Sequence, residues 1–89
     1  MANLTFAHGS VSVGTTATFV ATVTAVIVQN AGETAVFLGG PNVTATGATQ
    51  GICLAANATM TIPTVALLAH DLYAVVASDT GSLVYLSPQ

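Results

Sequence analysis

The chain has 89 residues, of which 53% are hydrophobic, and its charged side chains are three carboxylates, Glu33, Asp71 and Asp79. An average soluble domain is about 25% charged, so Thr, Ser, Asn, Gln and backbone groups must wet most of this surface. Because no Lys or Arg is present to neutralise phosphate groups, we exclude nucleic acid, anionic membranes and phosphorylated cofactors as partners.

Short apolar runs rich in Val and Thr recur at intervals of about ten residues, separated by Gly, Asn and Pro. β-Branched residues fit a pleated sheet and restrict helical rotamers. The pattern predicts one all-β domain over residues 1–89, a single antiparallel β-sandwich or small jelly-roll-like barrel of about seven to eight strands. The expected strands in chain order are 11–13, 17–20, 23–30, 34–38, 52–54, 59–62, 71–77 and 82–86.

The first ten residues lack strand periodicity but contain the isolated apolar residues Leu4 and Phe6. We therefore expect residues 1–10 to form an extended N-terminal arm that reaches a neighbouring protein, with Leu4, Phe6 and His8 as its contacts. The same segment lacks the basic and continuous apolar regions of a signal peptide. We accordingly expect the protein to be made in a cytosol and to stay soluble.

Alternation within the expected strands predicts which side chains are buried. Residues 23–30 carry apolar side chains on both faces, which predicts a central strand with both faces covered. Met60 and Ile62 alternate with threonines, so both are expected to face the core. Cys53 lies between two aliphatic residues and is expected to be a small hydrophobic residue of the core.

Turn signals separate the expected strands. Asn-Ala-Gly-Glu at 30–33 and Ser-Asp-Thr-Gly at 78–81 are sequences that favour tight turns. They predict two hairpins, one after strand 23–30 and one joining the last two strands. Residues 43–51 are expected to form a polar loop, while 63–70 fits either a single helical turn or an apolar loop.

The apolar excess also predicts assembly. A chain of this size buries only about 60% of its unfolded surface when it folds alone, and a single cysteine offers no internal disulfide. Exposed sheet edges are usually protected by lysines, and this chain has none. We therefore expect other subunits to cover part of the apolar surface and the sheet edges in a homo-oligomer.

Candidate catalytic groups are few. His70 and Asp71 are adjacent, and Ser78 and Asp79 follow them in the chain. A Ser-His-Asp hydrolase needs these groups brought together with an oxyanion hole and a substrate pocket, and nothing local in the sequence indicates that arrangement. We expect no enzyme activity, no catalytic residues and no cofactor. Scattered histidines and carboxylates likewise predict no metal site, unless a threefold assembly gathers His8 or His70 from three subunits.

The middle and end of the chain show a pattern of turns and alternating apolar residues, at 26–32 (VIVQNAG), 35–40 (AVFLGG), 43–45 (VTA), 52–57 (ICLAAN), 60–62 (MTI) and 71–77 (DLYAVVA). Over about residues 23 to 87 this pattern resembles that of the small β-rich head proteins of tailed bacteriophages, namely decoration or minor capsid proteins and related head-fibre bases. Members of that family usually retain a few basic residues, whereas this chain has none.

The resemblance implies a structural role. Such a protein sits on the outer surface of the virion capsid, often as a trimer at threefold or quasi-threefold positions. It clamps neighbouring subunits of the major capsid protein against the pressure of packaged DNA. The resemblance thus implies a homotrimeric capsid decoration protein made in the bacterial host cytoplasm, and Leu4, Phe6 and His8 then become candidate capsid or subunit contacts.

A second reading is a carbohydrate-binding or adhesion module of a phage head or tail fibre. Phe37, Tyr73 and Tyr85 could stack on a sugar ring, although aromatic residues in strands are more often core or interface anchors. Exposed, coplanar Tyr73 and Tyr85 beside Asp79 would favour the sugar-binding reading. Binding to a glycan array would distinguish the two readings.

Overall fold

The computed structural model describes residues 6–23, 25–62 and 70–88. These residues form a short 3-10 helix, η1 (Gly47–Thr49), and eight β-strands: β1 (Phe6–Val13), β2 (Thr18–Val23), β3 (Val26–Asn30), β4 (Val36–Gly39), β5 (Ile52–Leu54), β6 (Thr59–Ile62), β7 (His70–Val76) and β8 (Gly81–Pro88). No helix in these ranges is long and apolar enough to cross a membrane.

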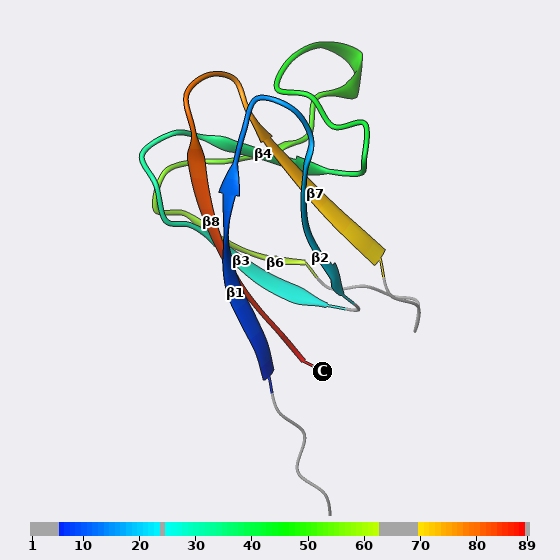
Figure 1. Cartoon of the computed structure of the whole chain (residues 1–89), viewed down its shortest axis with the longest axis vertical. Coiled ribbons are helices and arrows are strands. Elements are labelled where there is room, and N and C mark those ends of the chain that lie inside the picture. The colour runs from blue at the N-terminus through cyan, green and yellow to red at the C-terminus, as the bar shows by residue number, and fades with distance from the viewer. Residues whose placement is uncertain (1–5, 24, 63–69, 89) are drawn as a thin grey trace, which may run out of the picture.

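The strands form two antiparallel four-stranded sheets, ordered β1-β8-β3-β6 and β2-β7-β4-β5. The first strand pairs with the eighth, the second with the seventh, the third with the sixth and the fourth with the fifth. This nested pairing is that of a jelly roll, in which a long antiparallel ribbon wraps into two facing sheets. Figure 1 shows its outermost pair, β1 in blue beside β8 in orange and red.

The predicted antiparallel β-sandwich is therefore confirmed. The described strands form an open sandwich and not a closed barrel, because each sheet ends in two edge strands, β1 and β6 in one and β2 and β5 in the other. Two expected strands, 52–54 and 59–62, match β5 and β6 at both ends. The others are present with shifted ends, and residues 63–69 lie outside the described ranges.

The core lies between the two sheets and consists mainly of valines, whose branched side chains pack well on pleated surfaces. Burial alternates along β3, where Val26 and Val28 are buried and Ile27 is exposed. Met60 and Ile62 of β6 pack against this core, as predicted. The buried members of the cluster are Val13, Val20, Ala21, Val26, Val28, Val36, Leu38, Leu54, Ala74, Val76 and Leu83.

The single strand expected over 23–30 is wrong. The segment contains parts of two strands in different sheets, since β2 ends at Val23 and β3 begins at Val26. β3 is central in its sheet, but only one of its faces is covered by the described residues, because Ile27 is 42% exposed. The sequence at 23–26 contains no Gly, Pro, Asn or Asp to mark the point at which the chain passes from one sheet to the other.

The two expected hairpins are also wrong. Residues 31–35 connect β3 to β4 and residues 77–80 connect β7 to β8, and each connection crosses between the sheets. Among the described strands, β4 and β5 are the one consecutive pair joined by a ladder. The turn chemistry is present, and Asp79 has a left-handed φ of 63°. Turn residues reverse the chain without specifying which sheet receives the next strand.

The extended arm expected over residues 1–10 is wrong for residues 6–10, which belong to β1, and residues 1–5 lie outside the described ranges. β1 pairs with β8 without interruption from Phe6 opposite Pro88 to Val13 opposite Gly81. Its periodicity is hidden because Gly9 occupies an inward position. A Cβ on Gly9 would lie 3.0 Å from the Tyr85 hydroxyl oxygen, so the missing side chain leaves room for that ring.

Asn30, at the end of β3, links the two sheets. Its side chain is fully buried, and its Nδ2 donates hydrogen bonds to the carbonyl oxygens of Thr34 (2.8 Å) and Leu54 (2.9 Å). Its Oδ1 accepts a hydrogen bond from the Gly32 amide at 3.0 Å. Since Leu54 belongs to β5 of the opposite sheet, this one carboxamide joins the sheets and fixes the 31–34 connection.

Candidate interaction surfaces

The outer side of the β1-β8-β3-β6 sheet carries an exposed apolar surface. Its largest members are Phe6, Ile27 and Leu86, which are 65%, 42% and 38% exposed. Leu86 lies opposite both His8 of β1 and Ile27 of β3, so these side chains form one row across three strands. We call Phe6, His8, Ile27 and Leu86 the Phe6 face.

A shallow hollow of about 220 Å³ indents the Phe6 face. It is lined by Phe6, Ala25, Val26, Ile27, Thr61 and Leu86. The surrounding outer positions carry exposed polar residues without charge, Ser10, Ser12, Gln29, Thr59 and Thr61. All three carboxylates lie outside these four strands. The sheet therefore offers a partner an apolar patch at one end, with uncharged polar residues over the rest of its outer side.

Two of the three contact residues expected from the sequence lie on this face. Phe6 and His8 are exposed on β1, and Leu4 lies outside the described residues. Ile27 and Leu86 were not anticipated. The buried neighbours Val26 and Val28 already imply that Ile27 points outward, but only the strand register places it beside Leu86.

A second surface is formed by the loop between β4 and β5, drawn in green in Figure 1. The Thr44 amide donates to the Thr49 carbonyl oxygen at 3.0 Å, and the Gly51 amide donates to the Thr44 carbonyl oxygen at 3.0 Å. The hydroxyl oxygens of Thr44 and Thr49 are 2.8 Å apart. Val43 is buried beneath this loop, so the loop is an ordered part of the fold.

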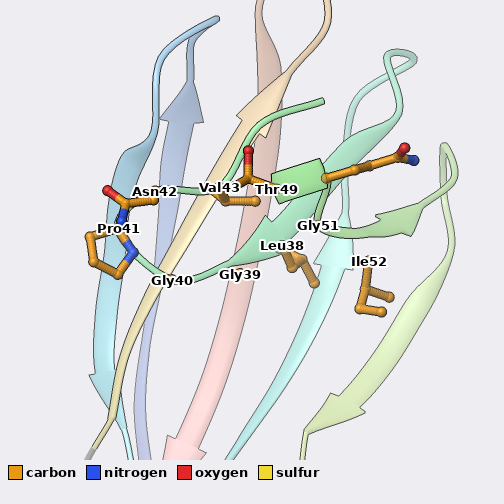
Figure 2. Close-up of a pocket in the computed structure, with 10 residues that line it drawn as sticks. Leu38, Gly39, Gly40, Pro41, Asn42, Val43, Thr49, Gly51 and Ile52 are labelled. Atoms are coloured by element: carbon orange, nitrogen blue, oxygen red, sulfur yellow. The ribbon is translucent and has the colours of Figure 1, made fainter. Parts of the chain in front are cut away.

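A hollow of about 420 Å³ lies beside this loop, lined by Leu38, Gly39, Gly40, Pro41, Asn42, Val43, Thr49, Gln50, Gly51 and Ile52. Figure 2 shows Pro41 and Asn42 on one side of it and Ile52 on the other. No lining residue is ionisable. The hollow can make hydrogen bonds and apolar contacts, but its lining offers no side chain for proton transfer.

The outer side of the other sheet carries an aromatic pair. Phe19 of β2 and Tyr73 of β7 are packed edge to face, with ring centroids 5.6 Å apart and planes at 74°. Close by on the same two strands, the Thr22 hydroxyl donates to Oδ1 of Asp71 at 2.6 Å. Phe19 is 49% exposed. The outer side of this sheet therefore carries the partly exposed Phe19 ring close to the Thr22 hydroxyl and the Asp71 carboxylate.

The alignment of Tyr73, Tyr85 and Asp79 that would favour sugar binding is absent from the described residues. Tyr85 belongs to the other sheet and packs inward against the core, whereas Tyr73 contacts Phe19. Asp79 lies in the connection between β7 and β8. No coplanar platform of Tyr73 and Tyr85 beside Asp79 therefore exists in this part of the chain.

The candidate catalytic groups are not brought together. His70 and Asp71 begin β7, while Ser78 and Asp79 follow its other end, which is about 25 Å away at the usual rise of a strand. The Asp71 carboxylate accepts a hydrogen bond from the Thr22 hydroxyl. Within residues 6–23, 25–62 and 70–88, no three His, Cys, Asp or Glu side chains are grouped so that they could hold a metal ion.

The prediction that Cys53 is a core residue is wrong. Its thiol is free and exposed. β5 is a three-residue edge strand in which Leu54 faces the core, so Cys53 points to the outside opposite Phe37. The residue type of Cys53 predicts burial, but the alternation of side chains along β5 places Cys53 on the outer side.

Comparisons with protein-family models, with curated proteins and with solved structures each gave no match.

Proposed function

We propose that this protein is a structural decoration protein of a tailed bacteriophage, which binds the outer surface of the major capsid protein as a homo-oligomer, expected as a trimer on the head. The observation that carries the proposal is the Phe6 face, an exposed apolar patch on a sheet whose other outer positions carry uncharged polar residues. Contiguous exposed apolar surface marks protein interaction sites. No catalytic or metal role is proposed.

The fold and the composition support the same function. Jelly rolls occur in viral capsid domains and also in lectins, so the fold alone does not select between them. A chain with no Lys or Arg has no side chain with which to hold packaged DNA, which suits the exterior of a head. The identity of the partner rests on the resemblance of residues 23 to 87 to phage head proteins.

The proposed contact of a single copy is weak, so several linked copies must bind together. Fully burying a Phe, Ile or Leu side chain contributes about 1.5–3 kcal/mol. Because Phe6, Ile27 and Leu86 are 65%, 42% and 38% exposed, covering them contributes roughly 2–4 kcal/mol. Association itself costs about 4–15 kcal/mol. One such face is therefore a weak binder, and linked copies would supply the avidity needed.

Sedimentation with capsids tests the proposal. Heads assembled without this protein, from a phage that encodes it, are mixed with the purified chain and pelleted. We expect saturable binding that is reduced at least tenfold when Phe6, Ile27 and Leu86 are changed together to Ser, Thr and Thr. The control is Gln50→Ala, in the exposed β4–β5 loop. Equal binding of the triple variant and the unchanged protein would refute a role for the Phe6 face.

Sugar binding stays as a second candidate because of the aromatic pair. A partly exposed Phe19 ring beside the hydrogen-bonded Thr22 and Asp71 groups could stack on a sugar and bond its hydroxyls. Glycan-array binding that disappears in Phe19→Ser but persists in the Phe6 triple variant would favour this candidate. Capsid binding with the opposite dependence would favour decoration.

A further inference from the structure

The four edge strands of the sandwich differ in how well they resist pairing with another chain. β5 has three residues and β6 has four. β2 is interrupted by a register shift between Phe19 and Ala21. Short strands and bulges are common ways of blocking an exposed edge. These three edges are therefore poor templates for a further strand.

β1 has none of these protections. It has eight residues, and its register with β8 is continuous from end to end. Its sequence contains no Lys, Asp, Glu or Pro, the residues that usually blunt an edge. In the described residues it pairs with β8 on one side only. Along its other side roughly every second residue turns its amide and carbonyl outward.

We infer that the free edge of β1 is a self-association site, at which β1 of a second copy of this chain adds antiparallel to form a two-fold dimer. A further extended strand matches a row of alternating backbone donors and acceptors along its whole length, so an unprotected edge is a template for pairing with another chain. The inference rests on the homo-oligomer part of the proposed function, but it proposes a two-fold contact between free copies and not the trimer expected on the head, and it does not need a capsid.

The distribution of side chains on β1 favours a second copy. Phe6, His8, Ser10 and Ser12 face outward, while Gly9 and Val11 face the core side. A two-fold axis perpendicular to the sheet, centred on Gly9 or Ser10, sets outward residues opposite outward residues. Neither register opposes two carboxylates or two lysines, since β1 has none. The pairing therefore carries no like-charge penalty.

The same axis brings the two Phe6 faces into one surface. Phe6 and Leu86 lie on β1 and β8, the two strands nearest the junction. Joining two β1 edges forms a continuous eight-stranded sheet with both Phe6 faces on the same side. Strand addition of this length makes a small interface, and interfaces below about 1,200 Å² are typically transient. The dimer is therefore expected to depend on protein concentration.

A matched pair of lysine variants tests this edge. Ser10→Lys places a charge on β1, and Thr59→Lys places the same charge on β6, the opposite edge of the same sheet; both positions are exposed. Sedimentation equilibrium should show a monomer–dimer equilibrium for the unchanged chain. Ser10→Lys should weaken it at least tenfold, while Thr59→Lys should leave it unchanged, with circular dichroism confirming that both variants fold.

Cross-linking provides the second measurement. In a Cys53→Ser background, Ser10→Cys should give a covalent dimer with a short bismaleimide, whereas Thr59→Cys should not. In the proposed dimer the Thr59 positions are seven strand spacings apart, roughly 34 Å. A monomer at every concentration, or equal cross-linking at both positions, would overturn the inference. So would a trimer as the only oligomer, because each β1 has one free side and three copies cannot all pair β1 with β1.

Failure of the dimer leaves capsid binding to be judged by its own sedimentation assay. Conversely, a protein that dimerises through β1 but ignores capsids supports the inference and refutes the proposed function. The two results are distinguishable because the dimer assay contains no capsid.

Discussion

The side-chain amide of Asn30 donates a hydrogen bond to the carbonyl oxygen of Leu54 at 2.9 Å, and this contact ties the end of β3 to β5 in the opposite sheet. The same carboxamide also holds the carbonyl oxygen of Thr34 and the amide of Gly32. One buried polar side chain thereby links the two sheets, a connection that a disulfide often makes in other small domains.

Replacing Asn30 should destabilise the fold strongly. Asn30→Ala leaves the buried Leu54 carbonyl and its neighbours without a donor, and each unsatisfied buried group costs about 1–3 kcal/mol. We expect a loss of roughly 2–4 kcal/mol in the free energy of unfolding, measured by urea denaturation. Asn42→Ala, at an exposed position, is the control and should stay within about 0.5 kcal/mol. Similar midpoints for the two variants would contradict the role assigned to Asn30.

Two glycines at the ends of the β4–β5 loop should respond differently to alanine. A Cβ on Gly51 would collide with the Leu38 carbonyl oxygen and with Cγ2 of Val43, while a Cβ on Gly40 meets nothing within 4 Å. Gly51→Ala should therefore lower the free energy of unfolding by about 1–3 kcal/mol. Gly40→Ala should be nearly neutral. The urea midpoints of the two variants test this prediction, and a neutral Gly51→Ala would contradict the close approach of Gly51 to the Leu38 backbone.

The Cys53 thiol should react in the folded protein. Because it is exposed on the outer side of β5, we expect one equivalent of a chromogenic disulfide reagent to react without denaturant, at the rate of a small free thiol. Cys53→Ser should remove the signal completely. Reaction that requires urea would mean that the thiol is covered in solution, for example by another copy.

Filling the space beside Tyr85 should loosen β1. A Cβ on Gly9 would lie 3.0–3.1 Å from atoms of the Tyr85 ring, so Gly9→Ala requires the ring to shift. We expect a loss of about 1 kcal/mol in the free energy of unfolding, together with faster amide exchange along β1. Gly14→Ala meets nothing within 4 Å and serves as the control. Equal exchange rates along β1 in the two variants would contradict this packing.

The strand pattern was the most predictable part of this protein. β5 and β6 follow from alternation and flanking turns alone, and the inward direction of Met60 and Ile62 follows with them. The sequence predicts too short a first strand because the inward Gly9 adds nothing to the apolar pattern. The missing side chain of Gly9 leaves room for the Tyr85 ring. Local sequence also cannot tell a hairpin from a crossing between sheets, which is why 30–33 was misassigned.

The candidate surface was only half predictable. Phe6 and His8 stand out in the sequence as apolar and titratable residues in a polar segment. Ile27 and Leu86 join them only through the pairing of β3 with β8, a long-range register that no local pattern encodes. Tyr85 points inward because it lies two residues after the buried Leu83 on β8, so it cannot form the exposed platform with Tyr73 that would favour sugar binding.

The nested pairing of the jelly roll also sets an order in which the chain can fold. β4 and β5 are the neighbouring strands that pair directly, and each pair outside them closes a short loop once the inner pair has formed. We expect pulse-labelled hydrogen exchange to show protection in β4 and β5 before β1, and simultaneous protection would contradict this order. Until β1 docks, β8 has an open edge, which the β1 of another copy can occupy as readily as its own. Exchange of β1 between copies then competes with correct folding. Synthesis of many chains at a high local concentration would increase this exchange.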